Sequence, residues 1–147
     1  MIDPAATLYY AVVPSDPADA GNGVFCGRLE AVNDGWVGIG FSPDGLMAGS
    51  QAVVGVPEEG TVLKYDLTTT ATPMDGARQT LTGTSIAVVD GLVIMRFEKL
   101  LVEDGEVPIL EDAVNRFIHA RGPPGALGYH GPEGRISFDV IPTARRL

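Results

Sequence analysis

Short apolar runs, separated at regular intervals by glycine and proline, most constrain the fold of this chain. The 147 residues include 19 glycines and 11 prolines, and turn residues at such spacing are typical of proteins with many short strands. The segments that we predict as strands are 8–13, 24–32, 36–41, 51–56, 62–67, 86–89, 92–97 and 135–141. Polar and apolar residues alternate best in 62–67 and 135–141, so each of these strands is expected to bury one face.

This pattern predicts an all-β fold, either a sandwich or a barrel, and we favour an antiparallel β-sandwich with immunoglobulin-like layers. Asn33-Asp34-Gly35 and Asp90-Gly91 each separate two predicted strands, and an Asp-Gly pair in that position indicates a hairpin. The Thr-rich segment 68–77 is expected to be a loop. Only 111–119 has apolar residues at helical spacing, so at most one short helix is expected.

Length and composition favour a single domain over 1–147. A chain that is 45% hydrophobic and 20% charged can bury an ordinary core. No run approaches the roughly 20 apolar residues of a membrane-spanning helix. The first residues carry no basic and apolar signal-peptide pattern, so we interpret the chain as an excised domain or as a mature chain with a start Met.

The net charge is −9 at pH 7, with a sequence pI of about 4.5. A surface of this sign repels a phosphate backbone and an anionic membrane, so we do not expect nucleic acid as a partner. The same charge favours association with a basic protein partner, although it also serves solubility.

The residues needed for catalysis by this chain alone are scarce. The chain has two histidines and one cysteine, it lacks a GxSxG motif, and it has neither the CxxC nor the HxxxH spacing of structural zinc. An internal disulfide needs a second cysteine, and we expect Cys26, in an apolar run, to be a small buried hydrophobic residue. We therefore do not expect an enzyme.

The segment 35–55 is unusual. Trp36, Gly38 and Gly40 are expected to share one face of a strand, where two glycines leave the backbone open to close approach. A Ser-Pro-Asp-Gly turn follows, and then Met47 lies in a short Gly-rich loop. An exposed loop is an unusual place for a methionine whose only role is packing, although a core-filling role is the alternative.

A second unusual segment, 117–135, is rich in turn residues and contains both histidines, His119 and His130. Tyr129 precedes His130 and a Gly-Pro pair follows it, which restricts the backbone there. This placement fixes the direction in which the His130 ring points.

Taken together, these segments resemble the DOMON domain family, β-sandwich domains related to the N-terminal domain of dopamine β-monooxygenase. The resemblance is carried by Gly-Trp-Val-Gly-Ile-Gly-Phe-Ser at 35–42, Met-x-Gly-Ser-Gln-x-Val-Val at 47–54, and Tyr-His-Gly…Gly-Arg at 129–135. Members of the family bind haem or sugars, or serve as interaction modules, so the family alone does not fix the function.

The chain most resembles the haem-binding branch, which includes the cytochrome domain of cellobiose dehydrogenase and DOMON domains found beside cytochrome b561 domains. The resemblance implies haem b with Met47 and His130 as axial ligands, and His119 is the runner-up for the second position. It also implies Arg121 or Arg135 as the partner of a haem propionate. The residues expected to line the pocket are Trp36, Val37, Ile39, Phe41, Leu46 and Tyr129.

The function that the resemblance implies is electron transfer with a redox partner protein or a fused redox or membrane domain. Relatives imply a location on the extracellular, periplasmic or lumenal side of a membrane. Two alternatives stay open, namely a carbohydrate- or small-ligand-binding module without haem, and a structural interaction domain.

Overall fold

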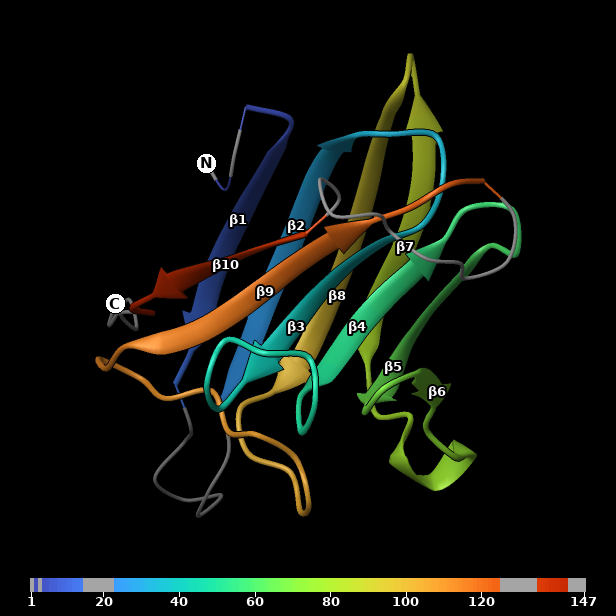
Figure 1. Ribbon diagram of the computed structural model, residues 1–147. Coiled ribbons are helices and arrows are strands. Elements are labelled where there is room, and N and C mark those ends of the chain that lie inside the picture. Colours follow the sequence, from blue (N-terminus) through green and yellow to red (C-terminus); the bar gives the residue numbers. More distant parts are fainter. Residues whose placement is uncertain (1, 3, 15–22, 125–134, 143–147) are drawn as a thin grey trace.

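Two antiparallel sheets face each other and form a β-sandwich (Figure 1). The computed structural model describes residues 2, 4–14, 23–124 and 135–142, and the statements below concern these residues. The strands are β1 (Ala6–Val13), β2 (Val24–Val32), β3 (Val37–Ser42), β4 (Gln51–Val56), β5 (Thr61–Leu67), β6 (Ala71–Pro73), β7 (Thr82–Val89), β8 (Leu92–Leu100), β9 (Asn115–Arg121) and β10 (Arg135–Val140). One 3-10 turn, η2 (Gly76–Arg78), follows β6.

The four-stranded sheet has the order β1-β2-β8-β7, and the six-stranded sheet has the order β10-β9-β3-β4-β5-β6. The described residues contain no α-helix, and none of their helices is long and apolar enough to cross a membrane. The predicted all-β antiparallel sandwich is therefore confirmed.

The core lies between the inner faces of the two sheets. Because side chains alternate along a strand, Phe25 and Leu29 of β2 point inward, and so do Ile39 and Phe41 of β3. The rings of Phe41 and Phe117 meet edge to face with centroids 5.0 Å apart. Burial of each such side chain contributes roughly 1.5–3 kcal/mol, which makes this cluster the main source of stability.

The predicted strand 51–56 has the observed bounds of β4, and 24–32 has those of β2. The other predicted strands differ from the observed ones by a few residues at their ends, β7 and β8 being longer than expected. Part of the predicted loop 68–77 forms β6, which pairs with β5.

The segment 111–119, where at most a short helix was expected, contains no helix, and its residues from Asn115 onward belong to β9, a strand that was not predicted. Asn115, Phe117 and His119 are buried and alternate with more exposed residues, which is the period of a strand. β9 lies between β3 and β10 in the sheet, and it forms backbone hydrogen bonds with both strands. That tertiary context overrides the weak local helical spacing.

The two Asp-Gly turns behave differently. Asp90 and Gly91 have φ of 52° and 78° and join β7 to β8 as the predicted hairpin. The hairpin predicted at Asn33-Asp34-Gly35 is wrong, since β2 and β3 belong to different sheets. There Asn33 Nδ2 donates to the carbonyls of Trp36 and Gly122, both at 3.0 Å, and the chain crosses between the layers.

Candidate functional site

The outer face of the six-stranded sheet has a second apolar cluster, separate from the core. Its buried members come from β4 and β5 and from the residue before β3, and Trp36 is only 5% exposed. An outward-facing sheet surface is ordinarily polar and solvated. The buried members of this cluster are Trp36, Ala52, Val54, Val56, Tyr65 and Leu67.

Small residues occupy the middle of this outer face. Gly38 pairs with Ala120 on one side and with Val54 on the other, and Gly40 pairs with Ala52. The missing side chains have two consequences. Ile118 lies directly over Gly40, where a Cβ would clash with it, whereas at Gly38 a Cβ would meet its nearest neighbours at 3.4 Å. The prediction that Trp36, Gly38 and Gly40 share a face agrees with this arrangement.

The loop after β3 brings Met47 onto this face, where it is half-buried against the cluster. Two serines hold the loop, because Ser42 Oγ accepts from Gly45 N at 2.9 Å and Ser50 Oγ donates to the Leu46 carbonyl at 2.7 Å. Gly45 has a φ of 85°, which a residue with a Cβ rarely adopts. The Ser-Pro-Asp-Gly sequence thus has a positioning role for Met47.

Several predicted lining residues lie elsewhere. Val37, Ile39 and Phe41 point into the core between the sheets, on the opposite side of β3 from Met47. Leu46 is adjacent to Met47 but is 66% exposed. Because side chains alternate along β3, its other face, with Gly38 and Gly40, lies on the Met47 side.

His119 does not lie beside Met47. It pairs with inward-facing Ile39 and is fully buried between the sheets. Its Nδ1 donates to the Gly38 carbonyl at 3.0 Å, and its Nε2 accepts from Arg121 Nη1 at 3.2 Å. Both ring nitrogens are thereby occupied, so the runner-up role of His119 as an axial ligand does not fit its position.

The two candidate arginines are on different faces. Arg121 pairs with inward-facing Val37 and contacts His119. Arg135 pairs with Ala120 of β9, which contacts the outer cluster, and it is exposed. The other predicted site residues, Tyr129 and His130, lie outside the described residues.

A buried charged group that sequence reasoning missed lies at one end of the sandwich. Lys64 and Lys99 point inward from the two sheets, and each side chain is 1% exposed. Lys64 Nζ is 3.0 Å from Glu103 and 2.9 Å from Glu106, and Lys99 Nζ is 2.7 Å from Glu103. The only sequence signal was the inward register position of both lysines.

Ionisable groups near these sites have shifted pKa values. Burial raises the pKa of Tyr65 and the Glu59 carboxylate adds to the rise, so the phenol stays neutral. Burial alone would raise the pKa of Glu103, but hydrogen bonds from Lys99, Thr80 and Lys64 outweigh it and lower that pKa. Within the described residues, no three His, Cys, Asp or Glu side chains gather as a metal site.

Cys26 was expected in the core, but it is half-buried on the outer face of the four-stranded sheet. Burial raises the pKa of its thiol, and the charge of Glu98 raises it further.

The described residues thus form a small β-sandwich with an apolar cluster on one outer sheet face and a methionine held against it by a short loop. The chain belongs to the DOMON domain family, whose model matches residues 25–122. That match spans β2 to β9 and includes Met47 and the whole outer cluster. A search of curated proteins finds no match to this chain.

Proposed function

We propose that this protein is a haem b-binding electron-transfer domain, with haem on the Met47 face of the six-stranded sheet. The observation that carries the proposal is the position of Met47, half-buried on an outward-facing apolar cluster. A porphyrin needs an apolar, water-poor surface and a ligand with a free lone pair, and these residues fit both requirements.

Met47 and His130 are the proposed axial ligands, and the assignment of His130 rests on the family resemblance. A thioether binds iron without losing a proton, and imidazole binds when neutral. Bound haem would supply one-electron transfer, with the raised potential typical of Met/His ligation. With both positions filled by protein, no separate enzymatic activity is proposed.

The surrounding residues have supporting roles in this proposal. Trp36 and Tyr65 exclude water from the apolar face. Gly38 and Ala120 pair with each other at its centre, and their small size leaves room there for a flat ring to approach the backbone. Arg135 is the better candidate for pairing with a propionate, since Arg121 is on the inner face and already contacts His119.

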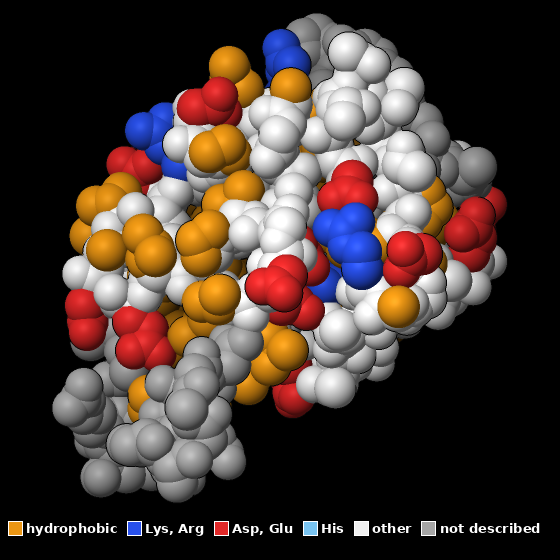
Figure 2. Space-filling view, turned by 90° about the horizontal axis from the view of Figure 1, so that it is seen from below, with side chains coloured by type: hydrophobic (Ala, Val, Ile, Leu, Met, Phe, Trp, Pro, Cys, Tyr) orange, Lys and Arg blue, Asp and Glu red, His pale blue; other side chains and the backbone are white. Residues whose placement is uncertain are grey.

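A redox partner would approach the end of the sandwich that contains the Met47 loop. Figure 2 shows hydrophobic side chains gathered on this end. Leu46, Leu110 and Val114 are exposed there, and a cavity of about 410 Å³ lies between Pro43 and the 107–117 segment. An apolar surface on an acidic protein suits a partner with an apolar centre and a basic rim. A location on the extracellular, periplasmic or lumenal side completes the proposal and rests on the resemblance alone.

The test is a hemin titration of the purified chain, followed by visible spectra before and after reduction with dithionite. We expect a sharp Soret band and resolved α and β bands on reduction. Met47→Leu removes the thioether but conserves volume, and it should abolish the low-spin spectrum while circular dichroism stays unchanged. Met74→Leu is the matched control, because Met74 is also buried but lies outside the outer cluster.

Each result has a defined meaning. If the unmodified chain gives no Soret shift with hemin, haem binding is excluded. An unchanged spectrum in Met47→Leu would overturn the ligand assignment only. The carbohydrate-binding alternative is less favoured because Trp36 and Tyr65, the rings on this face, are buried, whereas sugar sites use exposed rings.

A further inference from the structure

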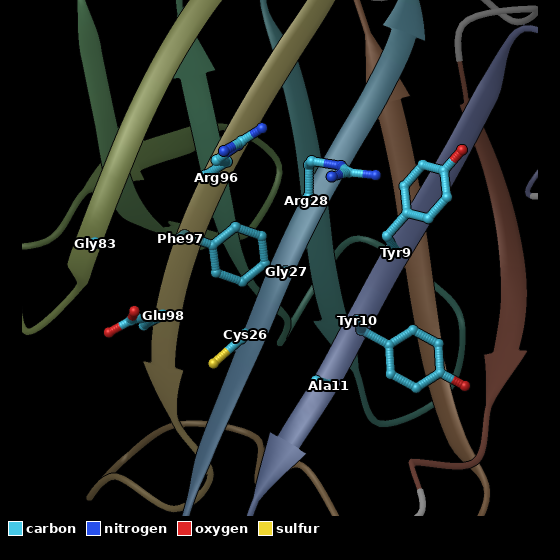
Figure 3. Close-up of a pocket in the computed structure, with 10 residues that line it drawn as sticks. All are labelled: Tyr9, Tyr10, Ala11, Cys26, Gly27, Arg28, Gly83, Arg96, Phe97 and Glu98. Carbon is cyan, nitrogen blue, oxygen red and sulfur yellow. The ribbon is translucent and has the colours of Figure 1, made fainter.

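Two arginines lie directly opposite each other on the outer face of the four-stranded sheet, away from the Met47 face. Arg28 of β2 pairs in register with Arg96 of β8, and Tyr9 of β1 pairs with Arg28 on its other side. Figure 3 shows the three side chains in one row across the sheet. They line a depression of about 360 Å³ with Tyr10, Cys26 and Glu98.

The acidic neighbours of this arginine pair already have partners. Arg28 lies over the Tyr9 ring, with its guanidinium carbon 4.3 Å from the ring centroid, and its Nε is 3.4 Å from Glu30. Glu98 accepts a hydrogen bond from Thr82 at 2.8 Å. Among the described residues, Arg96 has no ion pair or hydrogen bond.

Two other arginines on the surface have carboxylate partners. Arg78 is 2.7 Å from Asp66, and Arg116 is 2.7 Å from Asp139. In a chain of net charge −9, carboxylates are plentiful, so an unpaired guanidinium opposite a second one is unusual. Like charges directly opposite each other in a sheet destabilise it, and this cost disappears when an anion lies between them.

We propose that Arg28 and Arg96 bind a tetrahedral oxyanion, a phosphate or sulfate group on a small ligand, with Arg96 making the principal contact. The planar guanidinium forms two parallel hydrogen bonds to such a group. Tyr9 and Glu30 hold Arg28 in place, which lowers the entropy lost on binding. The volume of the depression suits a small ligand.

The experiment uses inorganic sulfate and inorganic phosphate as separate probes, at constant ionic strength maintained with chloride. Backbone amide and arginine Nε chemical shifts of the full chain are followed by NMR. We expect saturable shifts at Arg28 and Arg96 with both probes. Arg96→Gln should weaken binding about tenfold or more, because hydrogen bonds between charged groups are the strong ones.

Arg78→Gln is the matched control, since it removes the same charge from a site that is already paired, and it should bind as the unmodified chain does. The proposal is overturned if sulfate and phosphate cause no more shift than chloride, or if Arg96→Gln, shown to be folded by its spectrum, binds them equally well. Acetate binding as tightly as sulfate would overturn the tetrahedral class of ligand. None of these outcomes depends on haem, because the Met47 face belongs to the other sheet.

Discussion

Gly27, in the middle of β2, shows how tightly single residues fit in this sandwich. Its backbone lies under the ring of Phe97, and a Cβ at this position would meet Phe97 Cζ at 2.6 Å. Phe97 is itself fixed, because it is almost fully buried and stacks on Phe25 with ring centroids 6.1 Å apart. The ring therefore has little room to move, and glycine is required for contact rather than for backbone conformation.

We expect Gly27→Ala to lower the free energy of unfolding by about 1–3 kcal/mol, the usual cost of overpacking a core. Chemical denaturation measures this change. Gly76→Ala is the control, since a Cβ at Gly76 meets nothing within 4 Å, and its effect should stay within about 0.5 kcal/mol. Equal effects of the two substitutions would contradict the packing argument.

At the scale of the element, strand prediction succeeded where both faces of a strand differ in polarity. In β5, the alternation along 62–67 predicted two different faces, and the structure has Leu63, Tyr65 and Leu67 on one face and Lys64 on the other. Prediction failed for β9, where polar residues occupy inward positions. Asn115 is inward because its side chain binds the carbonyls of Leu110 and Val140, a long-range role without a local signal.

The candidate site was predictable to a similar degree. The position of Met47 after the Gly-Phe-Ser strand is a local motif, and so is the Trp36 face. The face to which His119 points depends on the register between β3 and β9, which spacing along the chain does not encode. The pairing of Arg28 with Arg96 likewise appears only once β2 and β8 are neighbours.

Strand β7 forms an edge of the four-stranded sheet and has no charged residue or proline along Thr82–Val89. All but one of its residues are exposed. Edge strands without such residues offer unpaired backbone groups to other chains. Its bulge, between Thr82 and Ser85, protects only one end.

We therefore expect Ala87→Lys to slow aggregation on mild heating, measured by light scattering, since the added charge disfavours pairing along this edge. Ala87 is exposed, so the core is left intact. A lysine at Thr70, exposed in the turn before β6, changes net charge equally and is the control. If Thr70→Lys slows aggregation as much, net charge and not the edge is responsible.

Over the whole molecule, the buried tetrad of Lys64, Lys99, Glu103 and Glu106 joins the two sheets. Lys64 comes from the six-stranded sheet and Lys99 from the four-stranded sheet, and both bind the β8–β9 connection. Its charges balance, so the tetrad adds no net charge to the interior. Removing a single member leaves an unpaired buried charge, which costs about 3–5 kcal/mol.

The tetrad also predicts how stability depends on pH. The pKa of Glu103 is lowered from its ordinary value of 4.5, so its contribution is present above pH 4.5 and is lost as the pH falls below that value. We expect unfolding free energies measured between neutral and strongly acidic pH to decrease in that window. Glu103→Gln should be less stable at neutral pH and should have a flatter profile below pH 4.5. Glu58→Gln, at an exposed turn, is the control and should have the stability profile of the unmodified chain. If Glu103→Gln also had the profile of the unmodified chain, the role of Glu103 in the tetrad would be contradicted.

The place of Trp36 gives the molecule an optical property of its own. It is the only tryptophan of the chain, and it packs on the Met47 face with little contact with water. Its fluorescence therefore originates from one known surface. An acceptor chromophore bound to that face would quench the emission by energy transfer, whereas a colourless anion on the far sheet would leave it unchanged, so a single intrinsic signal separates events on the two sides of the sandwich.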